Sequence, residues 1–167
     1  MLGVGSGQGD IVFIGGGGGE QEEREGEPGV GAAGKLLDMM LSLIDLERSN
    51  VYIANIVKCR PPKNRDPLNT EQDACIGYLR AQTALLRPKI IVCLGRIAAM
   101  RIIDKDFRIT RQHGQWFHRA GVAMTAIYHP SAVLRDPLKG PDTFVDLKSI
   151  QAKVKELCPD SLTPLVR

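Results

Sequence analysis

The sequence lacks the long apolar run that a membrane span requires, since no stretch approaches about 18 consecutive apolar residues. It also lacks a basic N-terminal segment followed by an apolar core, so no secretory signal is expected. Four cysteines without tight pairing, in 167 residues, fit a reducing compartment better than a disulfide framework. We therefore expect a cytoplasmic protein with no membrane partner.

Negative charge is scarce outside the first part of the chain. Residues 1–34 carry six acidic residues and one basic residue, or −5, whereas residues 35–167 carry 21 basic and 13 acidic residues, or +8. A basic body of this kind can attract a polyanion such as nucleic acid, although many inert surfaces are mildly basic. The length and the 43% hydrophobic content predict one domain over residues 1–167.

Short apolar runs alternate with segments of helical periodicity. Strands are expected at 11–14, 51–57, 90–94 and 122–128, and helices at 32–46, 70–86, 96–103 and from about 141 to 157. This order predicts an α/β protein, a three-layer α/β/α fold around a central four-stranded parallel sheet.

Polar or glycine residues follow each expected strand, beginning at Gly15, Asn55, Gly95 and His129. Because the carboxyl ends of parallel strands share one edge, these exits predict a single ligand pocket. Two of the segments, 55–67 and 129–137, also share an Arg-Asp-Pro sequence that adds positive charge and rigid turns.

Three motifs in this order carry a family resemblance: Asn55-x-x-Lys-Cys-Arg-Pro-Pro-x-Asn-Arg-x-Pro67, Cys59-x15-Cys75 and His129-Pro-Ser-x-x-Leu-Arg135. With them, the chain resembles family 4 uracil-DNA glycosylases, the iron–sulfur type, over nearly its whole length. The resemblance implies a uracil-DNA glycosylase fold and an enzyme of base-excision repair. Such an enzyme hydrolyses the N-glycosidic bond of deoxyuridine in DNA, and we expect it to act as a monomer on uracil-containing DNA.

The resemblance also assigns roles in the pocket. The amide of Asn55 can pair with O4 and N3–H of uracil, and His129 can donate a hydrogen bond to the departing base. Without the flanking motifs, Asn55 reads as a turn residue and His129 as a residue hydrogen-bonded at a strand end. The positions implied for the base and water side of the pocket are Gly15, Gly16, Gly17, Glu22 and Gly29.

Contacts to DNA are implied for a second group of residues. Leu134 would fill the space of the extruded base and Arg135 would hold a phosphate, the plain alternative being a core leucine beside a solvated arginine. Backbone contacts are expected from Arg60, Lys63, Arg65 and Ser131.

The chain departs from the family pattern where Gly15–Gly19 and Gly29 replace larger residues, including a carboxylate and a phenylalanine. Either the site has genuinely lost these side chains, or the glycines stand where the natural protein has other residues. A genuine loss keeps open a second function, a catalytically impaired module that binds uracil or damaged DNA.

The [4Fe-4S] cluster implied by the family needs four thiolates. Cys59 and Cys75 match two of them, and no Cys-x-x-Cys precedes the first strand. Cys93 reads as a buried structural thiol and Cys158 as a poor substitute, so the N-terminal ligand segment is expected to be missing or the cluster lost.

Two other patterns are weaker. The segment 29–36 formally matches dinucleotide and P-loop patterns, but an acidic stretch precedes it instead of the required strand. His113 and His118 lie with Trp116 in an expected hairpin or loop near 107–119, and we interpret them as packing or surface residues.

Overall fold

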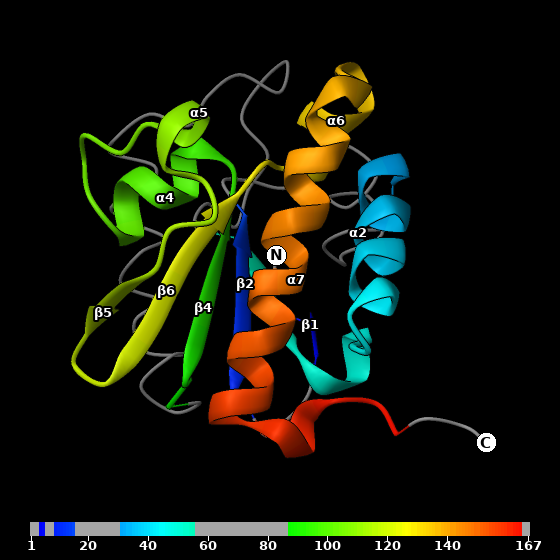
Figure 1. Ribbon diagram of the computed structural model, residues 1–167, viewed down its shortest axis with the longest axis vertical. Coiled ribbons are helices and arrows are strands. Elements are labelled where there is room, and N and C mark those ends of the chain that lie inside the picture. Colours follow the sequence, from blue (N-terminus) through cyan, green and yellow to red (C-terminus); the bar gives the residue numbers. More distant parts are fainter. Residues whose placement is uncertain (1–3, 6–8, 16–30, 56–86, 165–167) are drawn as a thin grey trace.

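The computed structural model describes residues 4–5, 9–15, 31–55 and 87–164 (Figure 1). Its centre is a sheet of six described strands in the order β1-β3-β2-β4-β6-β5. The inner four strands are parallel, and both edge strands run antiparallel to their neighbours. The bounds of the strands are β1 Val4–Gly5, β2 Ile11–Gly15, β3 Tyr52–Asn55, β4 Ile90–Leu94, β5 Phe117–Arg119 and β6 Val122–Ile127.

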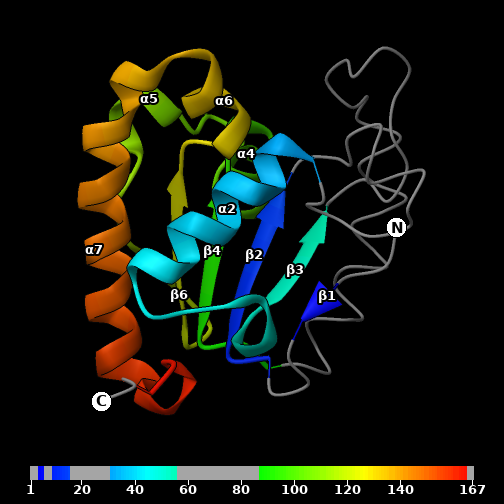
Figure 2. The ribbon, with the colours of Figure 1, turned by 90° about the vertical axis from the view of Figure 1, so that its right-hand side faces the viewer.

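Helices cover both faces of this sheet (Figures 1 and 2). The α-helices are α2 Ala32–Leu43, α4 Arg96–Ile102, α5 Ile109–Gln112, α6 Pro130–Arg135 and α7 Gly140–Leu157. Short 3₁₀ helices span Arg48–Asn50 (η1), Pro137–Lys139 (η3) and Pro159–Ser161 (η4). None of the helices in the described part of the chain is long and apolar enough to cross a membrane.

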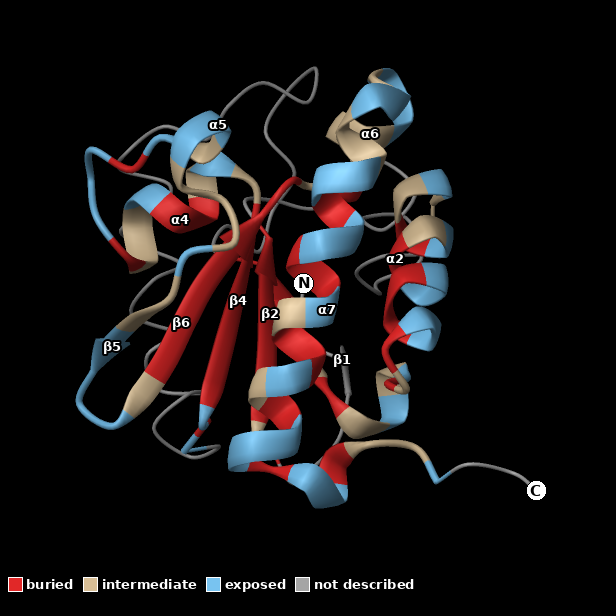
Figure 3. Cartoon of the chain, viewed as in Figure 1, coloured by how far each residue is buried: buried red, intermediate tan, exposed pale blue. Residues whose placement is uncertain are grey.

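The central strands are buried on both sides because their residues alternate between two apolar clusters. Ile11 and Phe13 of β2 face the cluster under α2 and α7, whereas Val12 and Ile14 face the cluster under α4. Every residue of β2 and β4 is buried, as expected of parallel strands covered on both faces (Figure 3). Continuous apolar runs, in which no polar residues alternate with the apolar ones, therefore form the two central strands of the sheet.

The α/β class and its parallel centre agree with the sequence prediction, but the sheet is larger than four strands. The two edge strands were missed because β1 has two residues and β5 has three, too few for a periodic pattern. β5 lies inside the expected hairpin near 107–119. A two-residue turn at Ala120 (φ 52°) and Gly121 (φ 80°) joins it to β6, with the left-handed backbone that such hairpins favour.

Element ends differ from the prediction by a few residues. The first helix was expected to reach residue 46 but ends at Leu43, and the chain turns at Asp45, whose φ is 62°. The second strand is described as far as Asn55. The remainder of that predicted strand and the predicted helix 70–86 lie outside the described residues.

Candidate active site

His129 lies at the junction of β6 and α6, at the carboxyl edge of the parallel strands (Figure 2). It is the N-cap of α6, and Pro130 follows at the first helical position, where a missing N–H costs nothing. The backbone N–H of Ser131 donates to Nδ1 of His129 at 3.0 Å, and the Ser131 hydroxyl lies 2.8 Å from the same nitrogen. The sequence His-Pro-Ser thus builds a helix cap whose capping group is the imidazole.

This cap fixes the tautomer of the ring. A backbone N–H can only donate, so Nδ1 accepts and carries no proton. In the neutral ring the proton therefore lies on Nε2, which is left as a donor. Burial of the ring and, to a smaller extent, the positive charge of Arg135 together lower the pKa of His129 from 6.5 to about 4. At neutral pH the side chain is an uncharged Nε2–H donor.

Asn55 ends β3 at the same edge of the sheet. In the strand register it pairs with Gly15, Gly15 pairs with Leu94, and Leu94 pairs with Ile127, two residues before His129. Three steps of about 4.8 Å between neighbouring strands separate the ends of β3 and β6 by roughly 14 Å. A planar base, with one side chain reaching it from each side, fits a gap of this width.

Gly15 leaves room for the Asn55 amide. A Cβ atom at Gly15 would lie 2.7 Å from Oδ1 of Asn55, closer than real contacts allow. Asn55 itself is 8% exposed, and within the described part of the chain no hydrogen bond engages its side chain. Among the described residues, the interpretation of Asn55 as a turn residue that bonds its own backbone therefore finds no support.

Gly95 brings β4 and α4 close to His129. Its φ of 89° is in the region that favours glycine, and a Cβ there would lie 3.2 Å from Cβ of His129. Its N–H donates to the carbonyl of Ile127 at 2.9 Å, which ties the end of β4 to the strand that carries His129. The sequence indicated Gly95 only as a strand exit; its contact with His129 depends on a pairing that no local pattern shows.

Leu134 and Arg135 form the last turn of α6, a short helix that the sequence analysis did not predict. Leu134 is 49% exposed and Arg135 is exposed, so the alternative interpretation of Leu134 as a core residue is wrong. Both project from the element that begins at His129. Ser131, predicted as a DNA contact, also places its hydroxyl beside the imidazole of His129, and its contact with DNA stays a prediction.

The other predicted site residues lie outside the described residues: Gly16, Gly17, Glu22 and Gly29 of the base pocket, Arg60, Lys63 and Arg65 of the DNA contacts, and the metal ligands Cys59 and Cys75.

The described residues do not supply the remaining ligands of an iron–sulfur cluster. No group of three or more potential metal ligands exists among them. Cys93 and Cys158 are buried and free, and they pack in the two clusters on opposite faces of the sheet. Burial also raises the pKa of both thiols, which disfavours the thiolates that a cluster needs. These two cysteines are structural.

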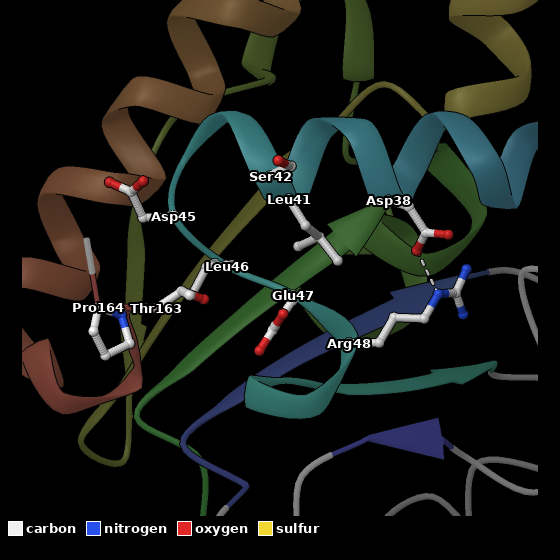
Figure 4. A pocket seen from close by; sticks show the side chains of 9 residues that line it. All are labelled: Asp38, Leu41, Ser42, Asp45, Leu46, Glu47, Arg48, Thr163 and Pro164. Carbon is white, nitrogen blue, oxygen red and sulfur yellow. Dashed lines mark hydrogen bonds and ion pairs between the residues drawn. The ribbon is translucent and has the colours of Figure 1, made fainter. Parts of the chain in front are cut away.

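A cleft of about 460 Å³ lies between the end of α2, η1 and residues 163–164, away from His129 (Figure 4). Its polar groups are engaged within the fold: Arg48 pairs with Asp38, Glu47 takes part in the cap of η1, and Asp45 accepts from Gln151 at 3.0 Å. We assign no ligand to this cleft.

Comparison with known proteins now identifies the family. The sequence model of the Uracil DNA glycosylase superfamily matches residues 2–152, which include the strand ends that carry Asn55 and His129. The chain belongs to the uracil-DNA glycosylase superfamily. It is 46% identical over 164 residues to the type-4 uracil-DNA glycosylase of Archaeoglobus fulgidus, covering 93% of this chain and 80% of that protein.

Other superfamily members are similar over less of the chain. The type-4 uracil-DNA glycosylase of Thermotoga maritima is 43% identical over 139 residues, covering 80% of this chain and 71% of that protein. The type-5 uracil-DNA glycosylase of Pyrobaculum aerophilum is 42% identical over 84 residues, covering 48% of this chain and 36% of that protein. Within the superfamily, the likeness to these type-4 proteins therefore extends further.

Proposed function

We propose that this protein is a uracil-DNA glycosylase that hydrolyses the N-glycosidic bond of deoxyuridine in DNA, releases uracil and leaves an abasic site for repair. The observation that carries the proposal is the neutral, tautomer-fixed His129 at the strand edge that also presents Asn55. Membership of the superfamily and the similarity to type-4 enzymes support it.

Base recognition falls to Asn55. An enzyme that works on a base must take it out of the stack and read its polar edge in a pocket. The amide offers a donor for uracil O4 and an acceptor for N3–H, whereas cytosine presents the opposite groups. Because the amide is buried, and no hydrogen bond from the described part of the chain engages it, a base with the wrong edge would leave it unpaired, which is a strong basis for rejection.

Bond cleavage depends on His129. As the glycosidic bond breaks, the bonding electrons leave with uracil, and negative charge grows on its O2. A neutral Nε2–H at that oxygen stabilises the charge without giving up its proton, and removing one such donor typically costs about 100- to 1000-fold in rate. The cap from Ser131 holds the ring in the required tautomer throughout. Water completes the reaction at the sugar, a role that we assign to the segment containing Gly16 and Glu22.

Binding of the DNA is assigned to α6 and to the segment that follows β3 in the sequence. Leu134 enters the duplex where the base has left, and Arg135 holds a phosphate beside it. Further contacts to the DNA backbone are assigned to Arg60, Lys63, Arg65 and Ser131. The base pocket is assigned to Gly15, Gly17 and Gly29. We expect the protein to work as a monomer. A [4Fe-4S] cluster with Cys59 and Cys75 among its ligands would hold this segment in place, and no step of the reaction passes through it.

The proposal is tested by incubating the protein with a uracil-containing oligonucleotide and treating the product with alkali, which nicks abasic sites. We expect alkali-dependent nicking that falls at least about 100-fold in His129→Ala. Asn55→Asp should lose uracil excision to a similar degree, because a carboxylate offers uracil O4 no donor. Tight binding without nicking would favour the alternative, a binding module with an impaired site.

A further inference from the structure

We propose that His113 is a positioning residue for the reaction: it holds Tyr128, and through Tyr128 the catalytic His129, in place. The inference rests on the proposed function and adds a residue that lies outside the strand-end motifs. It is built from a contact chain that runs from α7, through the segment after α5, to the end of β6.

The chain begins at Asp146 on α7. Its carboxylate lies 2.6 Å from Nδ1 of His113, and the two side chains are only 7% and 18% exposed. Asp142, one turn earlier on the same helix, lies 3.9 Å from the other ring nitrogen. Both nitrogens of His113 therefore face carboxylates of one helix, and this fixes the plane of the ring.

Gly114 lets this contact form. Its φ is 79°, and a Cβ there would lie 2.1 Å from Oδ1 of Asp146, so the carboxylate occupies the space of the missing side chain. The N–H of Gly114 donates to the carbonyl of Ala126 at 2.8 Å. The segment 113–114 is thus attached to β6 just before Tyr128.

The ring of His113 then packs on the ring of Tyr128. The two centroids are 4.9 Å apart and the planes are tilted by 35°. Tyr128 is 7% exposed, and Nζ of Lys139 lies 5.5 Å from its centroid. Because Tyr128 is bonded directly to His129, the position of its ring constrains the backbone from which the imidazole projects.

Packing alone does not account for this arrangement. Burial raises the pKa of the Asp146 carboxyl, and the hydrogen bond from His113 opposes that rise. A buried ionisable pair adds little net stability compared with apolar residues of similar size. What the pair supplies is a fixed direction, which is what a donor aimed at one oxygen of a leaving base needs.

Single-turnover excision of uracil from an oligonucleotide tests the role of His113. We expect His113→Ala to slow excision roughly 10- to 100-fold, with KM changed by less than about twofold. His113→Phe keeps a ring against Tyr128 but loses the bond to Asp146. Its excision rate should therefore lie between the rates of the wild type and of His113→Ala. His118→Ala is the matched control, since His118 is an exposed histidine on β5, and its rate should not change.

The decisive comparison repeats the change in the His129→Ala background. If His113 acts through His129, His113→Ala should cost little there, whereas general destabilisation would cost the same in both backgrounds. Equal losses in the two backgrounds would overturn the proposal, as would a folded His113→Ala protein with the wild-type rate. Should His113→Ala fail to fold, His113→Gln takes its place, because it keeps a donor for Asp146 and loses only the flat ring.

A second measurement is independent of catalysis. The ¹⁵N chemical shifts of the His129 ring report its tautomer, and we expect them to change in His113→Ala and to stay constant in His118→Ala. Unchanged shifts in the folded His113→Ala protein would count against the proposal. A wild-type protein that does not excise uracil would instead refute the proposed function, while these shifts would still test the contact chain.

Discussion

At the scale of single residues, the site depends on one imidazole held by the backbone that follows it. The N–H of Ser131 fixes the proton of His129 on Nε2, and burial together with Arg135 keeps the ring uncharged. A histidine with an ordinary pKa would be partly protonated at mildly acid pH, and a charged ring could not accept at Nδ1. The low pKa therefore extends to lower pH the range over which the ring is neutral and Nδ1 accepts from Ser131.

This predicts where activity and stability are lost in acid. The pKa of His129 is about 4 in the fold against 6.5 as its ordinary value, so the unfolded chain takes up a proton first as the pH falls. The contribution of His129 to stability should be complete above pH 6.5 and should decline as the pH falls toward 4. We expect the acid limb of kcat/KM, which reports the free enzyme, near pH 4, measured on single-stranded substrate.

The same prediction has an electrostatic control. Arg135→Gln removes the nearby positive charge and should raise the pKa of His129, which would move the acid limb upward. The pKa can be measured directly by NMR titration of the His129 ring. An acid limb near 6.5 in the wild type would contradict the lowered value.

Gly95 offers a second prediction at this scale. Gly95→Ala strains a backbone at φ 89° and pushes a Cβ toward that of His129, 3.2 Å away, whereas Gly121 has φ 80° and nothing within 4 Å. Both substitutions should lower stability by about 1–3 kcal/mol, the cost of the strained backbone. Only Gly95→Ala should also reduce kcat. Equal kcat values for the two variants would show that the contact with His129 does not matter.

At the scale of elements, α6 joins chemistry to the grip on DNA. It begins with the imidazole and ends, one and a half turns later, with Leu134 and Arg135. Asp136 then caps η3 through the N–H of Leu138 and pairs with Lys139 at 2.9 Å. The exposed Leu134 thus projects from a turn with the His129 cap before it and the Asp136 cap after it. A turn fixed in this way suits an apolar wedge.

Leu134→Ala should weaken binding to uracil-containing duplex about tenfold, or about 1.4 kcal/mol, because the space of the flipped base is no longer filled. Leu43→Ala is the matched control. Leu43 is 51% exposed, close to the 49% of Leu134, but it is the last residue of α2 and does not belong to α6. Fluorescence anisotropy on duplex and single-stranded DNA measures both. A similar loss on single strands would argue against a wedge.

Elements also show how far sequence patterns reach. The buried strands β2 and β4 were predicted to within one residue, because a run of apolar residues buried on both faces is a strong local signal. The helix α6 was missed, since its six residues depend on a proline and on a histidine cap rather than on periodicity. His113 was interpreted as a packing or surface residue, and its ring does pack on Tyr128, but this contact joins residues that only the folded sheet brings together.

At the scale of the whole molecule, the charge asymmetry is a property of the sequence, whereas the single domain over residues 1–167 remains a prediction. The cluster remains a proposal for which the described cysteines offer no ligands. Cys93 and Cys158 lie on opposite faces of the sheet, so they cannot complete one cluster with each other.

We expect Cys93→Ala and Cys158→Ala to leave the iron content of the anaerobically purified protein unchanged, and Cys59→Ser to lower it. Iron analysis and visible absorption measure the iron content of each variant. Iron lost in Cys93→Ala with unchanged thermal stability would assign that buried thiol to the metal.

The order of the strands has a consequence for how activity is acquired during folding. Asn55 and His129 are 74 positions apart in the sequence (129 − 55). Asn55 ends β3 and His129 follows β6, and these two strands never pair with each other but flank the central pair β2–β4. The two halves of the site therefore come together only when both outer parallel strands have added to the central pair. Non-local parallel pairing is slow, so an incompletely folded chain can be compact and still have no site. The return of excision during refolding would then report the completion of the sheet, later than any signal from the helices.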